Sequence, residues 1–166
     1  MRTSRGGSSA LLCALVMLVV LTVQPVVAEG EEKEAEEWAE KPHELGLFLG
    51  VTTKEGESGF SLGFDYEYRL NLKFGVGGTL EFTAADFRES IAAASFYYHP
   101  WRKLKLVAAA GVEIGRADGT KEFLVRLGGE YGFEVGRRYD VAPAFYLDLT
   151  SEDVAVVIGA AVARSF

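Results

Sequence analysis

The sequence predicts an all-β protein, an eight-stranded antiparallel up-and-down transmembrane β-barrel. Three observations lead to this class. Apolar and polar residues alternate in eight successive segments between His43 and Phe166, glycines gather on the polar face of these segments, and aromatic residues gather near their ends. Side chains alternate across a β-strand with period 2, and no segment after His43 shows the period of a helix.

The first 28 residues predict a secretory signal peptide. Arg2 and Arg5 give a positive start, residues 11–23 form a short apolar core, and small residues end the segment at Ala28. A transmembrane helix would need about 20 apolar residues, and this run is several residues short. The only cysteine, Cys13, lies inside the segment, so a chain cleaved after Ala28 has no disulfide, cysteine metal ligand or cysteine nucleophile.

Residues 29–42 form an acidic segment that we expect to be a periplasmic tail. The run EGEEKEAEEWAEK contains a single aromatic residue, Trp38, and cannot bury enough apolar surface to fold alone. A solvated tail is the favoured interpretation, and a docking role for Trp38 is the alternative. Loss of Arg2 and Arg5 with the signal removes two positive charges and takes the formal charge from −7 to −9. This acidic balance argues against a nucleic-acid partner.

The barrel domain is expected over residues 43–166. The segment 59–83 shows the alternation most fully and predicts two strands joined by a tight turn at Leu70–Asn71. Turn-forming residues separate the other expected strands, which are 44–52, 90–99, 103–114, 122–134, 140–148 and 154–166. The strand 90–99 has the weakest pattern. Pro143 cannot donate to a strand ladder and predicts a local bulge.

Two kinds of barrel fit this alternation, because the apolar face can point inward, as in a soluble lipocalin-like barrel, or outward to lipid. Glycines on the polar face favour a polar interior, since the inside of an eight-stranded barrel is narrow. Strands of about 11 residues, tilted by roughly 40°, would stand about 27 Å tall, close to the ~25 Å apolar band of membrane barrels. Two aromatic girdles are also expected: Tyr66, Tyr68, Phe74, Tyr97, Tyr98, Trp101, Tyr131, Phe133, Tyr139 and Phe166 at the periplasmic rim, and Phe60, Phe82 and Phe123 at the other.

Phe166 ends an alternating apolar strand. In this the chain resembles the small outer-membrane β-barrel proteins of Gram-negative bacteria, namely the OmpA-type membrane domain and its OmpX- and OmpW-like, porin-family relatives. The resemblance covers residues 44–166 and is architectural. It implies outer-membrane lipids as surroundings, and it implies that the barrel assembly machinery and periplasmic chaperones act on the chain during biogenesis, with Phe166 as the assembly signal. Arg164 departs from the pattern, because a hydrophobic or aromatic residue is usual there.

The polar face carries many charges that would point into the lumen. The acids are Glu44, Asp65, Glu67, Glu81, Glu113, Glu122, Glu130, Glu134, Asp140 and Asp148, and the cations are Arg69, Lys73, Lys103, Lys105 and Arg126. Asp65, Glu67, Lys105, Arg126 and Glu130 are expected nearest mid-height. We hypothesise that Arg126 is the central cation, shared by Asp65, Glu67 or Glu130, similar to the ion-pair plug of OmpA-type barrels. A structural plug is favoured over a gated ion path, because unpaired buried charge is costly.

The sequence offers little for catalysis. His43 and His99 are the only histidines, His99 is expected at an interface or turn, and no nucleophile–base pair, metal-ligand spacing or phosphate loop can be named. We therefore predict neither an enzyme nor a cofactor. The turns expected to face outward are short, which disfavours a receptor. The predicted function is a structural outer-membrane protein with a plugged lumen, and the alternative is a small porin-like channel or transporter for ions or small solutes.

Overall fold

The computed structural model describes residues 41–84, 88–115, 119–135 and 139–166. The predicted signal peptide, 1–28, and residues 29–40 of the predicted acidic tail lie outside the described residues. Within the described ranges there is no helix long and apolar enough to cross a lipid bilayer. These ranges fold into one antiparallel sheet.

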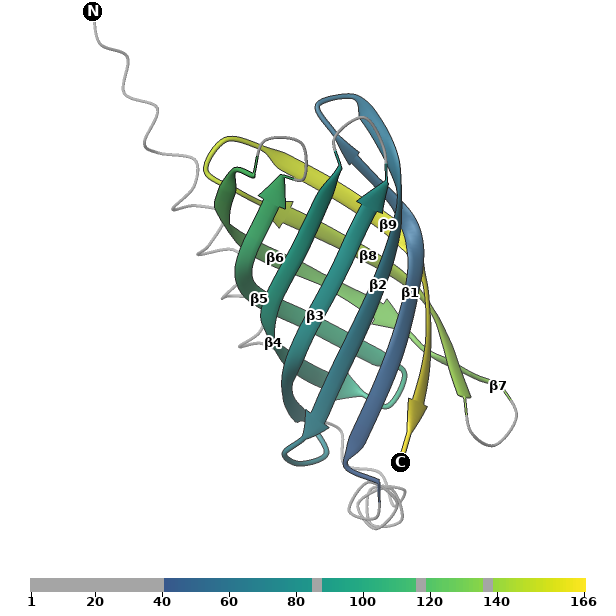
Figure 1. The fold of residues 1–166 in the computed structure, drawn as a ribbon. Helices are drawn as coiled ribbons and strands as arrows, with labels where there is room; N and C mark the ends of the chain where they lie inside the picture. Colours follow the sequence, from purple (N-terminus) through teal and green to yellow (C-terminus); the bar gives the residue numbers. More distant parts are fainter. Residues whose placement is uncertain (1–40, 85–87, 116–118, 136–138) are drawn as a thin grey trace, which may run out of the picture. The chain divides into compact units, whose positions relative to one another are not determined.

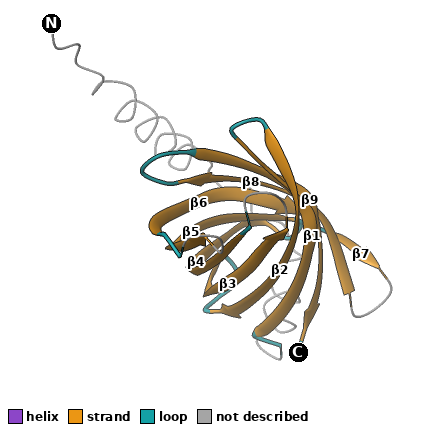
Figure 2. Ribbon diagram, turned by 45° about the horizontal axis from the view of Figure 1, so that its top comes forward, coloured by secondary structure: helices purple, strands orange, loops and turns teal. Residues whose placement is uncertain are grey.

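The sheet closes on itself to form a barrel (Figure 1). Strands that follow one another along the chain pair with each other, except that β6 and β7 both pair with β8, and β1 also pairs with β9 to close the wall (Figure 2). The strands are β1 (His43–Lys54), β2 (Glu57–Arg69), β3 (Phe74–Ala84), β4 (Glu89–Trp101), β5 (Leu104–Gly115), β6 (Lys121–Tyr131), β7 (Phe133–Val135), β8 (Tyr139–Leu149) and β9 (Val154–Ser165). We call the end where β1 begins and β9 ends the terminal mouth, and the other end the opposite mouth.

β6 and β7 act as one strand of the wall, so that the barrel has the eight antiparallel strands that were predicted. Both pair with β8 in a single register, in which Glu130 lies opposite Ala144 and Phe133 lies opposite Val141. The pairing with β8 is interrupted opposite Ala142 and Pro143, and Pro143 has no N–H to donate. The predicted bulge at Pro143 is wrong, because the register is the same on both sides of it.

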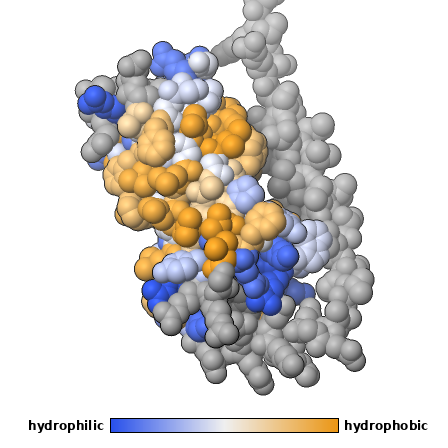
Figure 3. All heavy atoms as spheres, turned by 90° about the vertical axis from the view of Figure 1, so that its right-hand side faces the viewer, coloured by the Kyte–Doolittle hydropathy of each residue, from blue (hydrophilic) through white to orange (hydrophobic). Residues whose placement is uncertain are grey.

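The outer face of the wall is apolar and the inner face is polar. On β2, Phe60 is 55% exposed while its neighbour Ser61 is 0% exposed, and on β9 Ile158 is exposed while Val157 is buried. In the view of Figure 3, a hydrophobic band lies between hydrophilic ends. The predicted orientation is confirmed. The same exposure pattern argues against the lipocalin-like alternative, which requires an apolar interior.

Glycines make room inside the barrel for a large ring. Phe48 points inward from β1 and is 1% exposed. A Cβ added at Gly159 would lie 2.6 Å from the Phe48 ring, and one added at Gly50 would overlap that ring at its Cζ atom, both closer than carbon atoms approach. The predicted placement of small residues on the inner face therefore has a steric cause.

Most aromatic residues expected at the rims lie exposed on the outer face. At the terminal mouth these are Tyr66, Tyr68, Phe74, Trp101, Tyr131, Phe133, Tyr139 and Phe166, and towards the opposite mouth they are Phe60, Phe82 and Phe123. Tyr97 corrects this prediction, because it points into the lumen and is buried. On β4 small and aromatic residues occupy both faces, so the alternation alone did not indicate which face points inward.

Candidate functional site

Arg126 binds two carboxylates in the lumen. Its Nε and Nη2 donate to the two oxygens of Asp148 at 2.6 Å each, and its Nη1 donates to Glu81 Oε2 at 2.6 Å. Arg126 is 2% exposed, and Glu81 and Asp148 are 1% exposed. Asp148 is the register partner of Arg126 on β8, whereas Glu81 reaches it from β3. We call these three residues the Arg126 bridge, since they link separate parts of the wall through the lumen.

The partners of Arg126 differ from those expected. Asp65, Glu67 or Glu130 was expected to share this cation, whereas the structure pairs it with Glu81 and Asp148. The expectation was wrong because the stagger of tilted strands decides which side chains meet across a barrel. The position of a residue within its own strand does not reveal how far that strand is shifted relative to the others.

Hydroxyl groups extend the Arg126 bridge along the wall. Thr52 and Ser61 share a hydrogen bond at 2.6 Å, Ser61 and Thr83 share one at 3.0 Å, and the Thr52 hydroxyl donates to Glu81 Oε1 at 3.4 Å. All three hydroxyl side chains are buried. Thr52 thus provides a donor to the Glu81 oxygen that Arg126 does not use, as burial of a carboxylate requires, and Ser61 and Thr83 continue the chain from Thr52.

A layer of rings packs next to the bridge. Phe48 and Tyr146 meet edge to face with ring centroids 5.8 Å apart, and the Tyr146 ring centroid lies 5.1 Å from Arg126 Cζ. Tyr97 and Val157 belong to the same buried cluster. We call Phe48, Tyr97, Tyr146 and Val157 the aromatic plug. Its side chains fill the lumen next to the Arg126 bridge, and the Tyr146 ring packs against Arg126.

Lys105 links two carboxylates towards the terminal mouth. Its Nζ lies 3.0 Å from Glu130 Oε2 and 3.2 Å from Glu44 Oε1, and it lies 5.4 Å from the centroid of the Tyr97 ring. The Tyr146 hydroxyl donates to the other Glu130 oxygen. Lys105 and Glu130, both members of the predicted network, are thus in direct contact.

Asp65 has hydroxyl partners. Thr79 Oγ1 donates to Asp65 Oδ1 at 2.5 Å, and Thr79 also shares a hydrogen bond with Ser95 at 3.1 Å. This predicted network member therefore lies on a polar chain that runs over β2, β3 and β4. The structure brings it to the lumen without bringing it into contact with Arg126.

Glu67 is bound by His99, a histidine expected at an interface or turn. His99 Nε2 donates to Glu67 Oε1 at 2.8 Å, and Arg69 Nε lies 2.7 Å from the same oxygen. His99 is buried in the lumen, so the expected interface position is wrong. The Glu67 carboxylate lies against Gly75, where a side chain would displace it. Arg69 Nη2 also reaches Glu44 Oε2 at 3.6 Å and joins this cluster to the Lys105 pair.

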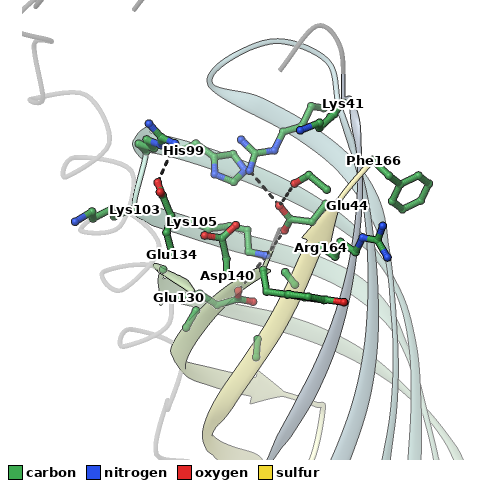
Figure 4. Close-up of a pocket in the computed structure, with 18 residues that line it drawn as sticks. Lys41, Glu44, His99, Lys103, Lys105, Glu130, Glu134, Asp140, Arg164 and Phe166 are labelled. Atoms are coloured by element: carbon green, nitrogen blue, oxygen red, sulfur yellow. Dashed lines mark hydrogen bonds and ion pairs between the residues drawn. The ribbon is translucent and has the colours of Figure 1, made fainter. Parts of the chain in front are cut away.

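An open cavity of about 630 Å³ occupies the terminal mouth. Figure 4 shows Glu44, Lys105 and Glu130 inside it, joined by dashed ion pairs, and Lys103 and Arg164 at its edge with their charged ends directed away from it. The cavity is lined by charged side chains and by alanines and aromatic rings, and the charges of Glu44, Lys105 and Glu130 inside it are paired with one another. It is a water-accessible vestibule on one side of the aromatic plug.

The opposite mouth holds a second charged cluster, which was not predicted from the sequence. Lys54 Nζ lies 2.8 Å from Glu113, 2.9 Å from Glu89 and 3.6 Å from Asp153. Lys54 lies outside the strand expected over 44–52, in the turn that follows it. The available signal was the presence of acidic residues at the ends of β4 and β5 and in the turn before β9, which need a cation when they are brought together.

Phe166, the predicted assembly signal, lies at the seam where the first and last strands meet. Its ring stacks on His43 with centroids 5.6 Å apart and an interplanar angle of 21°. The Phe166 N–H donates to the His43 carbonyl at 2.8 Å, and His43 Nδ1 shares a hydrogen bond with the Tyr66 hydroxyl at 2.8 Å. Phe166 therefore helps to hold the first strand, β1, against the last strand, β9, in the folded barrel.

Among the residues that the structure describes, no group of three or more His, Cys, Asp or Glu side chains is placed to bind a metal ion. No protein-family model matches the chain, and no curated protein matches its sequence.

Solved structures resemble the barrel. The N-terminal β-barrel domain of Pseudomonas aeruginosa OprF is 12% identical, with a TM-score of 0.57 over 76% of this chain and 98% of that one. The Yersinia pestis outer membrane protein Ail in a phospholipid bilayer nanodisc is 12% identical, with a TM-score of 0.52 over 74% and 99%. A de novo designed transmembrane β-barrel is 15% identical, with a TM-score of 0.53 over 76% and 98%. The chain has the fold of the small transmembrane β-barrels, as its sequence pattern predicted.

Proposed function

We propose that the protein is a structural, non-enzymatic barrel of a Gram-negative-type outer membrane whose lumen is closed. In this proposal residues 1–28 are cleaved as a signal peptide and residues 29–42 remain in the periplasm with the terminal mouth. The apolar band of the outer face faces lipid. The proposal is supported by the fold, by the outward apolar residues and by the outer-membrane origin of the natural barrels that resemble it.

The contact between the Arg126 bridge and the aromatic plug is the observation that best supports a closed lumen. The Arg126 bridge ties β3, β6 and β8 together with three short hydrogen bonds, and the aromatic plug covers it through Tyr146. A solute that crosses must break buried ion pairs and displace packed rings. Both steps are unfavourable, because unpaired buried charge and empty apolar space each cost several kcal/mol.

The partners that we propose are outer-membrane lipids and, during biogenesis, periplasmic chaperones and the barrel assembly machinery. The position of Phe166 beside His43 supports its proposed use as the assembly signal, because β9 must pair with β1 to close the barrel.

Solute efflux from liposomes tests the proposal. Residues 29–166 are refolded into liposomes loaded with a small fluorescent anion or a sugar, and a gel shift between boiled and unboiled samples reports folding. A closed lumen predicts efflux equal to that of empty liposomes. Folded protein with faster efflux would favour the porin-like alternative, and a chain that stays in solution without detergent would overturn the membrane barrel.

A paired variant makes the test sharper. Phe48→Ala removes the ring that fills the plug, and Leu80→Ala removes an apolar side chain from the outer face. If the plug closes the lumen, Phe48→Ala raises efflux and Leu80→Ala does not. Equal efflux from the two folded variants would contradict closure by the plug.

A further inference from the structure

One arginine stands on the apolar outer face of the barrel. Alternate positions of each strand form this face, and along the strands that the structure describes only Lys121 and Arg164 place a charged side chain there. Lys121 is the first residue of β6, at the opposite mouth. Arg164 lies on β9 between Val162 and Phe166, which are 42% and 49% exposed. A cation among lipid-facing apolar side chains is costly unless it finds a polar partner.

Arg164 has no ion pair or hydrogen bond with another side chain in the part of the chain that the structure describes. In the register of β1 and β9 it lies opposite Leu45, which is 53% exposed. Glu44 and Asp140, on the two neighbouring strands, line the cavity on the inner face. Figure 4 shows the charged end of Arg164 directed away from that cavity. Its partner must therefore come from the lipid side of the wall.

A second polar group lies beside Arg164 on the same face. His43 and Phe166 exchange both of their backbone hydrogen bonds, so Arg164, two residues earlier, is the diagonal neighbour of His43. Diagonal neighbours have Cα atoms about 7–8 Å apart, within reach of long side chains. His43 Nδ1 is held by the Tyr66 hydroxyl at 2.8 Å. When that hydroxyl donates to Nδ1, a neutral ring carries its proton on Nε2, which becomes a second donor to a ligand.

These two groups lie at the depth of lipid headgroups. Arg164 is two residues from Phe166, which at ~3.3 Å per residue and a tilt of roughly 40° is about 5 Å from the end of the strand. An arginine side chain can extend over such a distance to the membrane interface. Exposed rings flank the position, Tyr66 on β2 and Tyr139 on β8, as aromatic residues do at this level of a bilayer. The guanidinium therefore reaches headgroups rather than acyl chains.

We propose that Arg164 and His43 form a binding site at the β1–β9 seam for the phosphodiester of an anionic phospholipid. A guanidinium binds phosphate oxygens through two parallel hydrogen bonds. An anionic headgroup such as phosphatidylglycerol is favoured over a zwitterionic one, because it brings no second cation towards the arginine. The site rests on the proposed function, in that it requires a membrane barrel, but it does not depend on whether the lumen is closed.

Quenching of a tryptophan by brominated lipid tests the site. The reporter is Val162→Trp, next to Arg164 on the outer face, and Trp38→Phe and Trp101→Phe make it the only tryptophan. Residues 29–166 with these changes are refolded into phosphatidylcholine vesicles that contain a small fraction of brominated phosphatidylglycerol or brominated phosphatidylcholine. The site predicts an apparent affinity about five-fold higher for phosphatidylglycerol, the effect of one basic residue at an anionic surface.

Variants assign this preference to its residues. Arg164→Gln should remove it, His43→Ala should weaken it, and Arg164→Lys should keep part of it, because lysine binds phosphate as a point charge. The matched control is Lys121→Gln, which removes the other outer-face cation, at the opposite mouth, and should leave the preference intact.

Equal preference in the reporter chain and in folded Arg164→Gln would overturn the site. A preference that millimolar inorganic phosphate abolishes would also overturn it, because the ligand would then be a soluble anion. A gel shift between boiled and unboiled samples identifies the folded barrels on which these readings are made. A chain that stays in solution without detergent would overturn the membrane barrel as well, whereas a folded, inserted barrel without lipid preference would overturn the site alone.

Discussion

Removal of the Arg126 guanidinium tests the bridge most directly. Arg126→Ala leaves Glu81 and Asp148 buried without their cation, and both are 1% exposed. Removing one partner from a buried ion pair costs about 3–5 kcal/mol, because the remaining charge is left unpaired. We therefore expect the free energy of unfolding to fall by about this amount, a large part of a typical total of about 5–15 kcal/mol.

Urea unfolding in lipid vesicles, followed by the boiled and unboiled gel bands, measures this loss. The triple variant Arg126→Met/Glu81→Gln/Asp148→Asn removes the charges together and should recover most of the stability, since replacing a whole buried ion cluster is often close to neutral. Arg164→Ala is the control, because it removes an exposed arginine from the outer face and should change stability by less than about 1 kcal/mol.

The reasoning would be refuted if Arg126→Ala unfolded within about 1 kcal/mol of the parent chain. That result would mean that water solvates Glu81 and Asp148 as well as Arg126 does. A triple variant no more stable than Arg126→Ala would equally contradict the argument, because the cost would then lie in lost packing rather than in unpaired charge.

Three further predictions concern packing and closure. Phe48→Ala should lower the free energy of unfolding by about 3–5 kcal/mol in urea titrations, and a smaller loss would mean that the lumen collapses around the gap. Gly50→Ala should cost about 1–3 kcal/mol because its Cβ meets the Phe48 ring, whereas Gly46→Ala, on the same face of β1 with its nearest atom at 3.5 Å, should cost less; equal losses would remove the steric explanation. Phe166→Ala and His43→Ala should each cost about 0.5–1.5 kcal/mol in the refolded barrel and speed hydrogen exchange at the β1–β9 seam. If Phe166 is also an assembly signal, only Phe166→Ala should sharply lower the amount of folded barrel in cells, and equal cellular yields would leave it a purely structural role.

The local pattern of the chain was sufficient to predict the barrel. Alternation is a property of each strand by itself, so the wall strands, the outward position of Phe60 and the inward position of Glu67 followed from the order of residues alone. Glycines opposite large residues indicated a narrow interior, and the structure supplies the reason in the ring of Phe48. The orientation of β4 did not follow, because alanines and aromatic residues occupy both of its faces, and Tyr97 and His99 were misplaced for that reason.

Only the tertiary structure decided which charges meet. Arg126 and Glu81 lie 45 residues apart, on strands that are not neighbours in the wall. Whether they touch depends on the tilt and stagger with which eight strands close, a property of the whole barrel that no single segment encodes. Lys54 was likewise missed, because its three carboxylates come from β4, β5 and the turn before β9, which meet only when the wall is complete. Outside β4, the sequence by itself determined which residues point inward, and closure determined their partners.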